Sequence, residues 1–400
     1  MKKGPLNVHP DVIKLGIVSF LTDLSSEAIF SVFSLFFTVV AGASTSLLGL
    51  IEGLADLSAS SLNYFSGWLS DRYGKRKPLA VAGYGFSTVA KTILLFGTSV
   101  LALGSFRVIE RLGKSFRGPP KDAWLAEMTD ESTKGYVFGL HKAMDKAGAV
   151  LGPLVAYFLL RVLGESTGTF HVIFFLAVIT AALSVVVLLF IKDRPGISHE
   201  RENMFKAWGT LSPQFRSYLI PAGIFSLAYF SFGFLLLRAY SIGFSMGDVV
   251  LLYALFNVSF VIISIPIGKL GDIFGRKYIV ALGYVTYIIM SLGFVFATEK
   301  WEVVILFLLF GIFYSIDDAQ SKAFIMDIEK DRRATAIGVY NFVTGLIYLP
   351  ASVIAGVLWV MNPAYAFIFA AIVTSIAMGV FIVLRPWNQN LSQQDITENY

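Results

Sequence analysis

The chain has 400 residues, of which 56% are hydrophobic, 15% are charged and 36 are Phe, a composition that would leave a soluble protein with more apolar surface than its core could hide. It contains no Cys, which excludes disulfide frameworks, thiolate metal sites and cysteine nucleophiles. The formal net charge of +5 comes without an aromatic-interleaved basic module or finger spacing, so we expect no nucleic-acid partner. These features predict an integral membrane protein.

Apolar runs of about 20 residues, which a helix needs to cross a ~30 Å hydrocarbon layer, follow one another along the chain. The first begins near Val12 and is too long for a cleavable signal, so we expect it to remain in the mature protein. The fourth and fifth runs are rich in charge, and their clearer counterparts in the second half, the tenth and eleventh, support them. The predicted spans are centred near Ile29, Ser58, Val89, Val108, Val150, Ala181, Ala228, Ser259, Ile288, Phe310, Gly345 and Ile372.

The connections between these spans differ in charge on the two sides of the membrane. Those on one side hold most of the Lys and Arg, whereas the other side holds little beyond Arg161 and Lys300. The positive-inside rule then places both termini in the cytoplasm of a multi-pass plasma-membrane protein. We expect two six-helix bundles, 1–191 and 216–386, joined by a cytoplasmic central loop, 192–215, and followed by a cytoplasmic tail, 387–400.

A charged turn occurs twice, each time between two long apolar runs. The first glycine of each copy allows close helix approach, and the second allows a tight turn at positive φ. The aspartate between them can face the positive N-terminal end of a helix in the opposite half, where it would hold the inner side shut. The gating residues of the two copies are Gly67, Asp71, Gly74 and Arg76, and Gly268, Asp272, Gly275 and Arg276.

Both turns resemble the signature loop of the major facilitator superfamily, found there between the second and third helices and again between the eighth and ninth. The resemblance covers the whole chain, because the span count, the central loop and the duplication also agree with it. It implies an all-α membrane protein with twelve transmembrane helices in two pseudo-symmetric six-helix bundles around a central cavity. It also implies a monomer.

A second, partial resemblance lies in the fifth span. The run from Gly148 through Gly152 to Pro153 is similar to the glycine-proline core that drug and metabolite antiporters of this superfamily carry there, but Val155 and Ala156 follow where that motif usually continues with glycines. Helix packing explains the same residues, because small residues four apart admit a close neighbour and Pro bends the helix.

Ionisable side chains at membrane depth cost at least ~2.5–3.5 kcal/mol each on insertion scales, so they usually face a water-filled cavity. Asp23 and Glu27 lie four residues apart on one face of the first span. Two carboxylates this close repel each other when both are ionised, which favours one carrying a proton. We expect proton coupling or substrate contact, and the alternative is an ion pair with Arg107 or Arg111 that only holds spans together.

The fourth span places cations at three- and four-residue steps, with Glu110 between Arg107 and Arg111. It stands where superfamily antiporters carry an arginine motif, although the spacing of its glycine departs from that pattern. Asp145 of the fifth span is predicted across a cavity from Arg111, and His141 near the inner mouth is either a proton relay or solvated. A surplus of cations here would favour an anionic substrate.

Two further acidic pairs have open roles. Glu52 and Asp56 of the second span fall at a depth similar to that of Lys91. We expect these residues to form an outer gate or an ion pair. Asp317 and Asp318, near the middle of the tenth span, give the opposite electrostatic bias to the fourth span, so the charge of the substrate stays open.

These observations predict a secondary active transporter that moves a small organic solute by alternating access, by proton-coupled efflux of a drug or metabolite. The alternatives are proton-coupled uptake of an organic anion, a uniporter, and a solute sensor without transport. No G-x-x-x-x-G-K-[ST] loop suggests a primary pump, and the four His lack metal-site spacing. We therefore expect no enzyme, metal or cofactor, and as partners only the solute, protons and membrane lipids.

Overall fold

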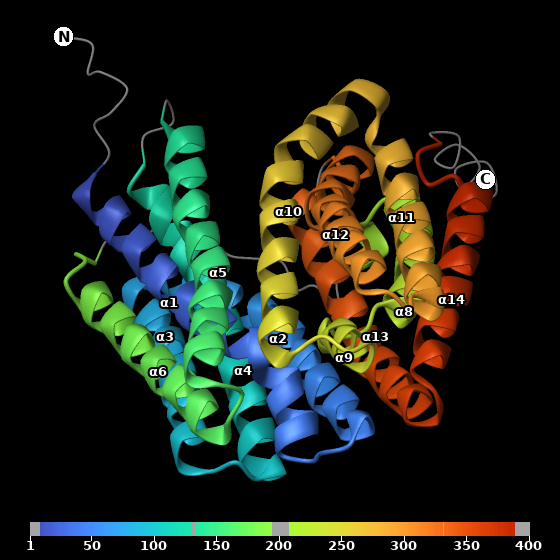
Figure 1. Ribbon diagram of the computed structural model, residues 1–400. Coiled ribbons are helices and arrows are strands. Elements are labelled where there is room, and N and C mark those ends of the chain that lie inside the picture. Colours follow the sequence, from blue (N-terminus) through green and yellow to red (C-terminus); the bar gives the residue numbers. More distant parts are fainter. Residues whose placement is uncertain (1–8, 130–132, 194–207, 331, 389–400) are drawn as a thin grey trace, which may run out of the picture. The chain divides into compact units, whose positions relative to one another are not determined.

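The computed structural model describes residues 9–129, 133–193, 208–330 and 332–388, and every regular element within these ranges is a helix (Figure 1). All the predicted span centres fall inside these helices, which confirms the all-α class and the order of the spans. Most of the expected central loop and C-terminal tail lies outside the described residues. The elements are α1 (Pro10–Leu35), η1 (Phe36–Val40), α2 (Thr45–Tyr73), α3 (Lys77–Phe96), α4 (Val100–Glu127), α5 (Lys134–Leu163), α6 (Thr167–Leu189), η2 (Trp208–Thr210), α8 (Pro213–Ala228), α9 (Gly233–Ser241), α10 (Met246–Phe274), α11 (Arg276–Phe296), α12 (Lys300–Ile328), α13 (Arg333–Met361) and α14 (Pro363–Leu384).

Length and apolar composition identify only some of these helices as membrane spans. Within the described residues, 9 helical segments are long and apolar enough to cross a membrane, and α2, α4 and α12 are not among them. The fourth span is charged, as predicted, but the fifth passes as apolar and the tenth does not. The fifth span is thus more apolar than the sequence suggested, and α12 carries Asp317, Asp318 and Lys322 within its length.

Serine caps start several helices where the chain enters the membrane. Ser99, Ser166 and Ser212 each accept a hydrogen bond from the backbone N–H three residues later, at 3.2, 3.3 and 3.2 Å. Such caps satisfy N–H groups that the first helical turn leaves without an intrahelical partner. The two repeated turns end their helices on glycines in the left-handed region, Gly74 at φ 63° and Gly275 at φ 95°, as the turn chemistry predicts.

The seventh span is broken rather than continuous. Helix α8 ends at Ala228 and α9 begins at Gly233. Side chains satisfy the backbone groups that this break exposes: the hydroxyl of Tyr287 donates to the carbonyl of Ala228 at 3.0 Å, and the N–H of Gly233 donates to the hydroxyl of Ser231 at 3.2 Å. A break at membrane depth requires such partners, because no water is available in the hydrocarbon core.

The chain packs as two compact units that differ from the two sequence halves at two helices. Unit 1 contains the described residues within Met1–Ala43, Leu54–Arg201 and Phe244–Ala254; unit 2 contains those within Ser44–Gly53, Glu202–Gly243 and Leu255–Tyr400. The first turns of α2 thus belong to unit 2, and the first turns of α10 belong to unit 1.

Helices α1 and α5 run side by side in unit 1 (Figure 1). Gly148 and Gly152 of α5 make this possible, because a side chain at either position would run into the α1 backbone at Phe20 or Leu24. Gly83 and Gly113 bring α3 and α4 together in the same way. Small residues allow this close packing, which replaces the hydrophobic driving force that helices lack in lipid.

Candidate transport site

Asp23 and Glu27 of α1 are half-buried, and α1 packs against α5. The hydroxyl of Tyr253, from the part of α10 that belongs to unit 1, donates a hydrogen bond to Glu27. Asp23 is within electrostatic range of Glu27, of Asp145 on α5 and of Lys114 on α4. Unit 1 therefore brings three carboxylates together beside basic groups, an arrangement in which one proton changes the balance of charge.

The arginines of α4 have partners other than the α1 carboxylates. The guanidinium of Arg107 lies 4.3 Å from the centre of the Phe30 ring, and that of Arg111 lies 5.8 Å from the same ring. Arg111 also pairs with Asp56 of α2 at 3.2 Å. The contacts described for Arg107 and Arg111 are thus cation–π contacts and one ion pair.

A second polar cluster joins α1, α3 and α4 in the interior of unit 1. The ammonium of Lys91 donates to the hydroxyl of Ser26 at 2.9 Å, and Ser26 donates to Glu110 at 3.4 Å. Ser87 also donates to Glu110 at 3.4 Å. Lys91 and Glu110 are both 0% exposed, so each offsets the cost of burying the other's charge.

Asp145 and His141 lie one helical turn apart on α5, in different surroundings. Asp145 lies 3.9 Å from Lys142 on its own helix. His141 is buried, and its Nε2 is 3.0 Å from the hydroxyl of Ser19 on α1. The interpretation of His141 as a solvated side chain was wrong, because the α1–α5 contact encloses it.

The two repeated turns are held by matching ion pairs. In the first, the buried Arg76 donates to Glu127 at the end of α4 at 3.0 Å and to Ser70 at 2.6 Å. In the second, Arg276 pairs with Asp327 near the end of α12 at 2.8 Å and with Asp272 at 3.3 Å. Each turn is therefore fastened to the fourth helix of its own half.

Other residues of the turns have less definite surroundings. The side chain of Asp71 lies outside the part of the chain that the structure describes. Within the described residues, a side chain at Gly268 would meet no atom within 4 Å, whereas one at Gly271 would meet Gln320. The space beside the second turn is thus filled at Gly271, by the end of the Gln320 side chain.

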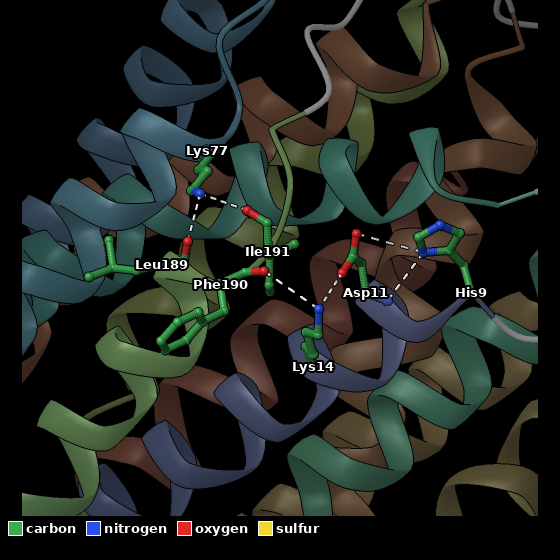
Figure 2. Close-up of polar contacts among 7 residues, drawn as sticks. All are labelled: His9, Asp11, Lys14, Lys77, Leu189, Phe190 and Ile191. Carbon is green, nitrogen blue, oxygen red and sulfur yellow. Dashed lines mark hydrogen bonds and ion pairs between the residues drawn. The ribbon is translucent and has the colours of Figure 1, made fainter.

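Lys77, which follows the first repeated turn, and Lys14 of α1 hold the C-terminal end of α6 (Figure 2). Lys77 donates to the carbonyls of Leu189 and Ile191 at 2.9 and 2.6 Å. Lys14 of α1 bridges Asp11, at 2.9 Å, and the carbonyl of Phe190, at 3.5 Å. Cations at a helix C-terminus satisfy its last carbonyls and complement its dipole, so α1, α3 and α6 are joined at this end.

Unit 2 holds the remaining predicted residues. Glu52 is buried and accepts a hydrogen bond from Ser231, in the break of the seventh span, at 3.1 Å. Asp318 pairs with Lys322 at 2.8 Å, whereas Asp317 lines a small pocket inside the unit. Arg238 of α9 donates to the carbonyl of Phe294 at 3.0 Å, next to the end of α11, which gives it a capping role.

Several partners could not be found from local sequence. Ser26 is an ordinary residue of an apolar span, and no periodicity marks it. Glu127 and Asp327 could have been found from the sequence, because an acidic residue lies near the end of the fourth span in both halves.

Long membrane helices in two units, a charged turn repeated in both, and buried charges within the spans define an integral membrane protein of the duplicated transporter type. Residues 15–241 and 222–394 match the sequence profile of the Major Facilitator Superfamily. The chain belongs to this family.

Relatives over most of the chain agree. It is 34% identical over 374 residues to the uncharacterized MFS-type transporter MJ1317 of Methanocaldococcus jannaschii, covering 92% of this chain and 93% of that protein. It is 24% identical over 356 residues to multidrug resistance protein 2 of Bacillus subtilis, covering 86% and 87%. The crystal structure of the nucleoside transporter NupG superposes with a TM-score of 0.73 at 13% identity, covering 94% and 98%, a likeness of fold alone.

Proposed function

We propose that this protein is a proton-coupled secondary transporter that exports a small organic solute by alternating access. The observation that carries the proposal is the set of carboxylates in unit 1, where Asp23 and Glu27 lie half-buried beside Asp145. Carboxylates at membrane depth are costly and usually act on ions or substrate. Export is supported by the similarity to multidrug resistance protein 2, whose name refers to resistance.

Protonation in this set changes two contacts at once. When Glu27 is ionised it accepts the hydrogen bond from Tyr253, and its charge adds to that of Asp23. A proton on either carboxyl removes repulsion between them and changes the attraction of Lys114 for the group. The proton is thereby coupled to the position of α10's first turns against α1.

The repeated turns and the outer residues have supporting roles in this proposal. The turns, fastened through Arg76 and Arg276, gate the cytoplasmic side, and Glu52 with Ser231 serves the outer gate. We further propose a monomer in the plasma membrane with both termini in the cytoplasm, and bundles of 1–191 and 216–386 joined by the loop 192–215.

The test uses protein reconstituted in liposomes with an imposed pH gradient and a mixed set of metabolites and drugs. Protein-dependent flux should follow the gradient, and Asp23→Asn and Glu27→Gln should abolish gradient-driven flux while folding normally. Asp318→Asn is the matched control, because it removes a carboxylate that pairs with Lys322 on its own helix. Flux that ignores the gradient and survives both α1 substitutions would falsify proton coupling.

Uptake of an organic anion is a second candidate, favoured by one observation. Arg107 and Arg111 place two guanidinium groups over the ring of Phe30, a combination suited to an aromatic carboxylate. Inward flux of such an anion, lost in Arg107→Gln and unaffected by unlabelled cationic drugs, would favour uptake over export.

A further inference from the structure

A small pocket inside unit 2 takes no part in the function proposed above. It lies between α8, α11, α12 and α13 and has room for about one water-sized group. Aromatic rings make up much of its wall, and one carboxylate reaches into it. The residues that matter for its chemistry are Tyr218, Phe225, Tyr284, Phe313, Asp317 and Tyr340.

Hydroxyl groups lie beside the carboxylate. Ser321, one helical turn beyond Asp317 on α12, lines the pocket, and so does Tyr218 of α8. These hydroxyls can form hydrogen bonds with a bound group, but they bring no positive charge to the carboxylate.

The pocket offers Asp317 no dedicated counter-ion. Among the described residues that line it there is no Lys, Arg or His. The cation nearest along the helix is Lys322, which is within electrostatic range of Asp317 but pairs with Asp318 at 2.8 Å. A carboxylate enclosed at membrane depth needs a proton or a cation as its partner, and the pocket has space beside it for either.

The aromatic wall favours a cation of a particular size. Phe225 lies at steep angles to its neighbours, with ring centres 5.1 Å from Tyr284 and 5.9 Å from Phe313. Tyr218 and Tyr340 are stacked with their centres 6.3 Å apart. Aromatic faces attract ammonium groups through their quadrupole, and a primary ammonium is about as large as a water molecule.

We propose that this pocket binds the primary ammonium group of a small organic amine, with Asp317 as its counter-ion and the surrounding rings as its wall. Three N–H donors match the carboxylate, the Ser321 hydroxyl and the phenol oxygens. A quaternary ammonium is bulkier than the head of a primary amine and has no N–H group to donate to these oxygens. The inference does not depend on the direction or the coupling ion of transport.

The test is ligand binding by the purified full-length protein in a neutral detergent, with methylammonium chloride as the probe. Thermal unfolding is followed as the probe is raised at constant ionic strength, with sodium chloride and tetramethylammonium chloride as comparisons. A ligand that binds only the folded state raises the unfolding midpoint as its concentration passes the dissociation constant. We expect this response for methylammonium and not for the two comparison salts.

Two variants and a matched control decide the location of the site. Asp317→Asn should weaken methylammonium binding more than about tenfold, and Asp318→Asn should leave it unchanged. Phe313→Leu keeps an apolar side chain without an aromatic face and should weaken binding about two- to fivefold, which tests the site if Asp317→Asn does not fold. Equal stabilisation by sodium, or binding that persists in both pocket variants, would overturn the proposal. Because binding is read without flux, its failure is separate from a failure of proton-coupled transport.

Discussion

Replacing Gly148 by Ala should weaken the contact between α1 and α5. A methyl group at this position would lie 3.0 Å from the amide nitrogen of Leu24 and closer still to the carbonyl oxygen of Phe20. Both of these are backbone atoms of α1, which cannot rotate away as the end of a side chain can. The two helices must therefore move apart locally, until the new methyl group is at van der Waals distance from these α1 atoms.

The expected magnitude follows from two opposing terms. Overpacking of this kind costs about 1–3 kcal/mol, because a gap of 0.5–1 Å along the seam forfeits roughly a quarter to a half of each contact's attraction. Replacing a helical Gly by Ala recovers about 0.5–1 kcal/mol of backbone entropy. The net loss of unfolding free energy should then be about 1 kcal/mol, and at most about 2.5 kcal/mol.

Gly139→Ala is the matched control, because it lies on the same helix and a methyl group there meets no atom within 4 Å in the described structure. It should gain the entropy term alone. Both variants are compared by detergent-induced unfolding with Trp fluorescence, to which the fully buried Trp124 of unit 1 contributes. Equal stability of the two variants would refute the reasoning that α5 is pressed against the α1 backbone.

Five further variants test the buried and capping charges by the same unfolding measurement. Arg76→Ala removes a buried guanidinium whose partner Glu127 is 25% exposed, and should cost about 1.5–3 kcal/mol through its lost charged hydrogen bonds. Arg276→Ala, whose side chain is 27% exposed and faces a partner that is 54% exposed, should cost less than about 1 kcal/mol; equal losses would contradict this difference. Lys91→Met should destabilise strongly because it leaves Glu110 buried without its cation, and adding Glu110→Gln should restore much of the loss; simple additivity of the two would show that the charges are not coupled. Arg238→Ala should cost about 1–3 kcal/mol through lost hydrogen bonds to carbonyls at the end of α11, and an unchanged midpoint would remove its capping role.

The fold was accessible from the sequence because its strongest signals repeat. The charged turn fixes two equivalent places in the chain, and hydrophobic runs of membrane length fill the intervals between them. Even the spans that are too charged to be recognised by apolarity, such as α4 and α12, are located by the spans on either side. Repetition thus supplied information that composition lacked.

The break in the seventh span was not predictable in the same way. The residues between α8 and α9 are Tyr229, Phe230, Ser231 and Phe232, which suit a continuous membrane helix. What permits the break is Tyr287, whose hydroxyl reaches Ala228 from another helix. A contact between residues so far apart in the chain depends on tertiary packing, which local pattern does not encode.

At the candidate site, the sequence predicted which residue types matter but not which residues they contact. Acidic residues at membrane depth were identifiable from the cost of placing them there. Their partners were not, since Glu27 meets Tyr253 and Lys91 reaches Glu110 through Ser26. Spacing along one helix predicts which side chains share a face, but it says nothing of what another helix brings to that face.

The interruption between α8 and α9 also determines where unit 2 can bend at least cost. Elsewhere in a membrane helix, bending must lengthen or break backbone hydrogen bonds in a solvent that cannot replace them. Between Ala228 and Gly233 that ladder is already open, and two hydroxyl groups hold its ends. Amide hydrogen exchange should therefore be faster at residues 229–232 than in the helices on either side. The short rod of α9 can tilt there by exchanging side-chain contacts alone, which makes this point a natural hinge for the α9 end of the span.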